Sequence, residues 1–95
     1  REKREKTLEV LARKMAIRTV RNYTYHEYAD DFLKFVADRE NSTRLRVIMA
    51  EALGWFTHSR KAPDIVEGCR RILAEEKDMA PELRGELTQT IIRLQ

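Results

Sequence analysis

The side chains best suited to metal chemistry lie near position 26. His26 and Asp30 are four residues apart, a spacing that places two ligands on one face of a helix. A zinc site needs three or four such ligands, and the other histidine, His58, lies far along the chain. We therefore predict no metal and no cofactor.

Aromatic side chains cluster at the same place. Tyr23, Tyr25, His26 and Tyr28 form the densest aromatic group in the sequence, and such a group can stack on bases or anchor a peptide. Tyr28 also belongs to an apolar stripe at helical spacing. We therefore predict that the group packs at a turn and a helix start.

Catalytic motifs are missing from the sequence. It contains no Gly-rich phosphate loop, no His-Glu-x-x-His pair and no nucleophile-elbow pattern. Asp30 precedes Lys34, and Glu67 precedes Arg71, by four residues, which is ordinary charge pairing on a helix surface. The single cysteine, Cys69, falls on an apolar stripe and is predicted to be a small buried hydrophobe. We expect no catalytic residue and no enzyme activity.

Length and composition indicate one globular domain. The 95 residues are 42% hydrophobic and 37% charged, and 19 Lys and Arg against 16 Asp and Glu leave a net charge of +3. The two signs interleave, so the charge is weak support for nucleic-acid binding. No apolar run approaches the ~18 to 20 residues of a membrane span. The sequence opens with no secretory signal, and the cellular compartment stays unknown. Because the chain starts with Arg1 and its last helical pattern reaches Gln95 without a stop signal, we expect a fragment of a longer protein.

Helical periodicity runs through the chain. Apolar residues recur at spacings of three and four in five segments, whereas residues 1–6 are charged and are expected to fray. Pro63 and Pro81 fit the first turns of the fourth and fifth helices, where a missing N–H is tolerated. Residues 7–95 are therefore predicted to form one all-α domain of five antiparallel helices.

Two kinds of helix recur at nearly the same period. A shift of 38 residues superposes Leu45, Arg46, Met49, Leu53 and Phe56 on Leu83, Arg84, Leu87, Ile91 and Leu94. A shift of 37 superposes Tyr28, Ala29, Phe32, Phe35 and Val36 on Ile65, Val66, Cys69, Ile72 and Leu73. Such a recurrence indicates stacked helical hairpins in the order A-B-A-B-A, with repeats at 7–41 and 42–78 and a half repeat at 79–95.

The residues that open these helices resemble a known repeat. Leu45-Arg46 followed by Ala50-Glu-Ala-Leu-Gly54, then Ala62-Pro63, then Ala80-Pro-Glu-Leu-Arg84, is similar to the bacterial HEAT-repeat pattern over Thr43 to Leu94. The resemblance implies an α-solenoid wound as a right-handed αα superhelix. It also implies that Arg46 and Arg84 brace neighbouring repeats through hydrogen bonds to a carboxylate or a backbone carbonyl.

The same resemblance implies where a partner would bind. In HEAT-like solenoids the second helix of each repeat lines the concave face, which here gives a candidate binding face of Asp30, Asp31, Lys34, Glu67, Arg70 and Arg71. Trp55 is predicted to seal a repeat junction while half-buried, and the alternative is an exposed anchor for a partner.

These features favour a non-catalytic scaffold or protein–protein interaction module. One alternative is a nucleic-acid-binding solenoid, which needs a continuous Lys/Arg stripe and is opposed by Asp30 and Asp31. Another is an accessory helical segment of a multidomain enzyme. Exposed terminal helices would also allow an end-to-end dimer of this chain.

Overall fold

Helices and the turns between them make up the part of the chain that the computed structural model describes, residues 6–10, 12–13, 28–57 and 59–95. Residues 6–10 and 12–13 are helical. The later helices are α2 (Ala29–Ala37), α3 (Thr43–Leu53), α4 (Ala62–Glu75) and α5 (Pro81–Leu94). These ranges contain no strand, so the predicted all-α class is confirmed for them. Tyr23, Tyr25, His26 and His58, on which the aromatic and metal predictions partly rest, lie outside the described residues.

The helix starts follow the local chemistry of the sequence. Ser42 caps α3, because its hydroxyl oxygen accepts a hydrogen bond from the backbone N–H of Leu45 at 3.3 Å. Asn41, the residue before it, donates from its side-chain amide to the carbonyl of Phe35 at 2.9 Å. Pro63 and Pro81 lie in the first turns of α4 and α5, as predicted.

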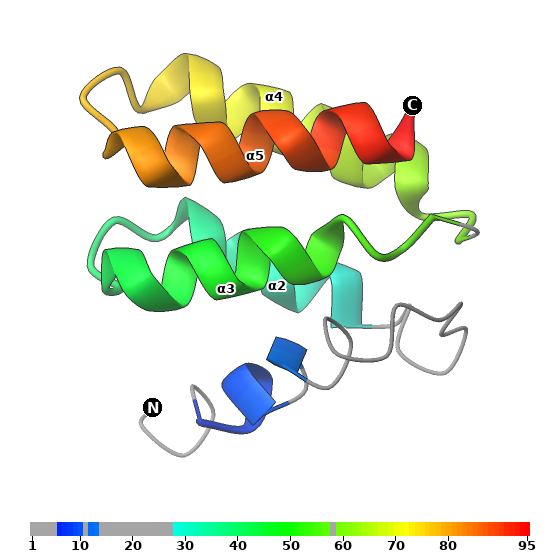
Figure 1. Ribbon diagram of the computed structural model, residues 1–95, viewed down its shortest axis with the longest axis horizontal. Helices are drawn as coiled ribbons and strands as arrows, with labels where there is room; N and C mark the ends of the chain where they lie inside the picture. The colour runs from blue at the N-terminus through cyan, green and yellow to red at the C-terminus, as the bar shows by residue number, and fades with distance from the viewer. Residues whose placement is uncertain (1–5, 11, 14–27, 58) are drawn as a thin grey trace.

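The helices form two stacked hairpins. One hairpin joins α2 to α3 through residues 38–42, and the other joins α4 to α5 through residues 76–80. Across the stack α2 packs on α4 and α3 packs on α5 (Figure 1). Residues 54–61 carry the chain from one hairpin to the next.

The predicted run of five antiparallel helices implies that each consecutive pair of helices packs together. It holds for α2 with α3 and for α4 with α5, but α3 and α4 do not form one of the main packed pairs. The stretch 54–61 places them on opposite layers of successive hairpins. The tightly looped units are therefore α2–α3 and α4–α5, whereas the predicted repeat 42–78 joins α3 to α4.

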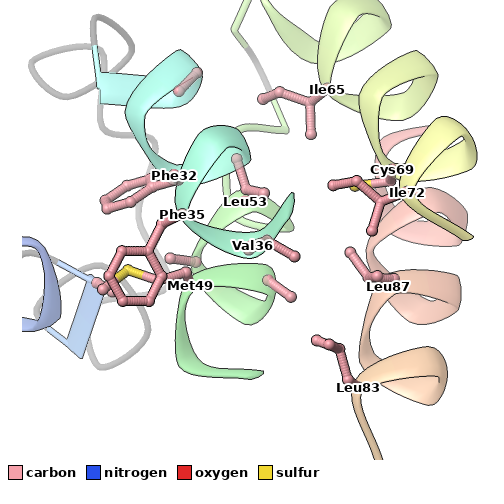
Figure 2. Packing of buried hydrophobic residues seen from close by; sticks show 14 of the residues in the cluster. Phe32, Phe35, Val36, Met49, Leu53, Ile65, Cys69, Ile72, Leu83 and Leu87 are labelled. Atoms are coloured by element: carbon pink, nitrogen blue, oxygen red, sulfur yellow. The ribbon is translucent and has the colours of Figure 1, made fainter. Parts of the chain in front are cut away.

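The core runs through both hairpins (Figure 2). Phe32 and Cys69, which are 37 residues apart, are both 0% exposed, and so are Met49 and Leu87, which are 38 apart. Figure 2 shows Val36 pointing from the first hairpin toward the second. The buried positions thus repeat with the sequence period, as amphipathic helices of a stacked repeat require.

Residues 6–10 and 12–13 cover the opposite side of the first hairpin (Figure 1). Leu8 and Ala12 are buried in the same cluster, and the carboxylate of Glu9 lies 3.8 Å from the guanidinium of Arg44 in α3. The stack therefore has one end covered by Leu8 and Ala12 and one end formed by α4 and α5.

Candidate interaction face

A buried arginine ties the two hairpins together. Arg46 in α3 is 4% exposed, and its Nε donates to the carbonyl of Val36 at 2.7 Å. Its two terminal nitrogens donate to the two carboxylate oxygens of Glu76, at 3.1 and 2.5 Å. Bidentate pairs of this kind are strong and directional. Since Glu76 directly follows α4, the pair fixes the second hairpin against the first.

Two more arginines surround the end of α4. Arg39 donates to the carbonyl of Glu75 at 2.8 Å, and its Nε lies 3.8 Å from the carboxylate of Glu76. Arg84 donates to the carbonyl of Glu76 at 3.1 Å. Arg46 therefore spans the two hairpins, whereas Arg84 bonds within its own hairpin.

The ionisation of Glu76 follows from these contacts. Its hydrogen bonds to Arg46 hold the pKa of the Glu76 carboxyl below its ordinary value, and the charges of Arg46 and Arg39 act in the same direction, while partial burial opposes them. The carboxylate is thus ionised and fully engaged, which makes it a structural group.

Exposed charges form two rows across α2 and α4. Asp30 and Lys34 on α2, and Glu67 and Arg71 on α4, are all exposed. The second pair follows the first by 37 residues, so each helix carries an acid and, one turn later, a base at the same face. Because α2 and α4 pack side by side in the same direction, Asp30 and Glu67 make an acidic row, and Lys34 and Arg71 make a basic row. We call this surface the outward face.

The expected pairing within each helix is not what the structure shows for Asp30. Its carboxylate lies 3.8 Å from Nζ of Lys61, at the start of α4, with side chains 66% and 34% exposed. Lys34 and Arg71 are exposed on the same helices. The basic side chains of the outward face are therefore accessible to a partner.

Two predicted face residues lie elsewhere. Gly68 faces α2, since a Cβ built there would meet Leu33 at 2.8 Å, and Arg70 is two residues further on, about 200° around the helix. Arg70 therefore points away from α2, toward the uncovered end of the stack. Asp31 is half-buried and follows Asp30 by one residue, so it too lies off the outward face.

Trp55 lies at the junction of the two hairpins. It is half-buried, and the guanidinium of Arg93 in α5 lies 4.9 Å from its ring centroid, a cation–π contact. Nearby, the hydroxyl of Thr90 donates to the carbonyl of Ala50 at 2.7 Å. A Cβ added at Gly54 would lie 3.0 Å from Arg93 and 3.1 Å from Thr90, so α3 and α5 approach closely there.

The polar atoms of this junction are strongly enclosed. The indole Nε1 of Trp55 and one terminal nitrogen of Arg93 are buried and have no hydrogen-bond partner in the part of the chain that the structure describes. Burial and the neighbouring charge of Glu51 raise the pKa of the Glu86 carboxyl, while Arg93 lowers it. In the structure Trp55 is thus half-buried and packed against Arg93 at the junction.

The chemistry of the remaining candidates is limited by burial. Cys69 is 0% exposed, and burial raises the pKa of its thiol to about 12. Within the described ranges no three His, Cys, Asp or Glu side chains gather as metal ligands. No helix in these ranges has the length and apolar character to cross a membrane.

Sequence reasoning missed the residues that hold the hairpins together. Glu76, Thr90 and Arg93 were not candidates, although Glu76 and Thr90 contact the first hairpin and Arg93 contacts Trp55 at the junction. One signal existed for Glu76: it follows α4 directly, as Asp38 follows α2, and the two residues are 38 apart.

Comparison with protein-family models, curated proteins and solved structures gives no match to this chain. The resemblance to HEAT repeats therefore rests on the sequence pattern.

Proposed function

We propose that this protein is a non-catalytic, HEAT-like helical repeat scaffold, wound as a right-handed superhelix, that binds a protein partner through its outward face. The observation that supports this function is the pair of charge rows on α2 and α4. Two stacked helices repeat the same acid and base at exposed positions, where neither charge is needed for the core. Exposed charges in register on a rigid support are suited to recognition.

The rows define the chemistry of the partner. A segment lying along the stack would cross both helices, with the acidic row of Asp30 and Glu67 on one side and the basic row of Lys34 and Arg71 on the other. It would need basic side chains along one edge and acidic side chains along the other. Ala37 and Ala74 continue the same face with small exposed side chains, which allow close approach. Charge complementarity of this kind contributes mainly specificity and association rate.

The same arrangement disfavours a nucleic-acid ligand. A phosphate backbone is tracked by a continuous stripe of Lys and Arg, but here the basic row is bordered by the carboxylates of Asp30 and Glu67. These would repel phosphates beside the basic row. A protein with both signs of charge fits both rows.

Cross-linking with mass spectrometry tests this function. The protein is used as bait beside a variant with Lys34→Glu and Arg71→Glu, and beside a control with Arg60→Glu and Lys77→Glu, which alters two exposed charges off the outward face. Circular dichroism checks that all three fold alike. We expect a partner, cross-linked near α2 and α4, that the control retains and the row variant loses.

Two results would refute the proposal. One is a partner that binds the row variant as well as it binds the control. The other is a DNA or RNA duplex that binds with a steep loss of affinity on added salt and is released by the row variant, because the basic row would then contact phosphates.

A further inference from the structure

The second hairpin covers specific positions of the first. Leu33 lies against Gly68, and Arg46 is paired with Glu76. The carbonyl of Ala50 accepts the hydroxyl proton of Thr90. Each contact joins α2 or α3 to a residue of the second hairpin, so these positions define one side of the first hairpin.

Of the equivalent positions of the second hairpin, three are exposed and Arg84 is half-buried. They follow by 37 residues in α4 and by 38 in α5, and they are Arg70, Arg84, Thr88 and Ile92. Arg70 and Thr88 are exposed, and Ile92 is 59% exposed, whereas Ala50 and Gly54, the counterparts of Thr88 and Ile92, are buried. We call these four residues the end face. It lies on the second hairpin, at the edge of the stack opposite residues 6–10 (Figure 1).

Arg84 differs from Arg46 in one informative respect. Both guanidinium groups donate to backbone carbonyls, Arg46 to Val36 and Arg84 to Glu76 and Lys77. Arg46 also binds a carboxylate of the next hairpin, while the described residues place no carboxylate within ion-pair distance of Arg84. The side of α5 that carries Thr88 and Ile92 has no acidic residue, since Glu82 and Glu86 fall on other sides of the helix.

We propose that the end face docks a helical hairpin supplied from outside these 95 residues, with a Glu or Asp directly after its first helix. That carboxylate binds Arg84 as Glu76 binds Arg46. The docked helices cover Thr88 and Ile92 as α5 covers Ala50 and Gly54. This surface is separate from the outward face, and the inference does not depend on the proposed function.

A second copy of this chain fits the end face poorly. Docked head to tail, it would have to present its first hairpin, whose free side is already covered by Leu8 and Ala12. Docked end face to end face, it would bring Arg70 and Arg84 toward their own copies, which is unfavourable for like charges. An acidic hairpin has neither difficulty.

An extended chain tests the inference directly. Residues 1–91 are followed by a copy of residues 54–95, because Ile91 is the equivalent of Leu53, after which the first hairpin leads into the second. Gly54 of the copy then takes the place of Ile92, so Arg70, Arg84 and Thr88 are the end-face residues that this chain tests. Linking supplies the hairpin at a high effective concentration, so weak docking is detected. The measurements are urea unfolding and amide hydrogen exchange.

We expect one cooperative transition at a higher urea midpoint than that of the 95-residue chain, with slower exchange in α5. Glu76→Gln in the added copy should lower that midpoint, while Arg71→Gln in the added copy should leave it unchanged. An unchanged midpoint with added residues exchanging at unfolded rates would overturn the inference.

Sedimentation of the 95-residue chain decides the occupant. We expect a monomer. A dimer that Ile92→Lys separates would assign the end face to a second copy and overturn the choice of an outside hairpin. Neither experiment changes the residues of the outward face in the 95-residue chain, so failure here leaves the partner test of that face intact.

Discussion

Replacing Glu76 by Gln should sharply destabilise the protein. The change keeps the size of the side chain but removes its charge, which leaves the guanidinium of Arg46 in its buried position without a counter-charge. The Arg46 side chain is 5% exposed and that of Glu76 is 11% exposed. Removing one partner of a buried ion pair typically costs about 3 to 5 kcal/mol.

The geometry places the cost near the lower end of that range. The amide oxygen of Gln can keep one of the two hydrogen bonds from Arg46, so we expect a loss of about 3 kcal/mol. A domain of this length has a free energy of unfolding of about 5 to 14 kcal/mol. The variant should therefore lose roughly a fifth to three fifths of the free energy of unfolding, or about 2 M in urea midpoint for an m-value near 1.5 kcal/mol/M.

Urea unfolding followed by circular dichroism at neutral pH measures this loss. Arg39→Gln is the matched control: its side chain is 56% exposed and 3.8 Å from Glu76, so the loss should be about 1 kcal/mol or less. Changing Arg46 and Glu76 together to Met removes both charges and should cost less than Glu76→Gln alone. A Glu76→Gln variant within about 0.5 kcal/mol of the original protein would refute the structural role of the pair.

Three further outcomes follow from the surroundings of Glu76, Cys69 and Gly68. The pKa of Glu76 is lowered in the folded state. The stability advantage of the original protein over Glu76→Gln should therefore be complete at a pH above ~4.3, the ordinary carboxyl pKa, and should vanish as the pH falls through the folded-state pKa. An advantage that persists in acid would contradict this. The thiol of Cys69, with its pKa near 12, should react with a disulfide reagent only as fast as the protein unfolds, and rapid labelling in native conditions would show that it is accessible. Gly68→Ala should destabilise the protein, because the added methyl group would clash with Leu33. In a Leu33→Ala variant the same change should stabilise the protein by about 1 kcal/mol, because Ala is the better helix former. Equal effects in both backgrounds would exclude the contact.

The sequence period predicted the core better than it predicted the packing partners. Phe32 and Cys69 are both fully buried, as their shared position in the period requires. The period does not say which adjacent helices form a hairpin, because A-B and B-A units repeat with the same spacing. That choice depends on the tight turn at 38–42 and the longer path at 54–61, whose packing is set by contacts distant in sequence.

The outward face was predicted in part for a similar reason. Helical spacing identifies Lys34 and Arg71 as solvent-facing charges, and both are exposed. The spacing alone cannot place Arg70, because its direction depends on which side of α4 meets α2. The contact between Leu33 and Gly68 settles that direction, and it is visible only in three dimensions.

Methyl and amide NOE spectra of the protein in solution would test the stacked arrangement on which both surfaces depend. With α2 on α4 and α3 on α5, NOEs should connect the methyl groups of Leu33 with the Hα atoms of Gly68, and Thr90 with Ala50. Strong NOEs between α3 and α4 along their length, with these cross-peaks missing, would mean that α2 and α4 do not lie side by side. The charged residues would then not form rows, and the account would be contradicted.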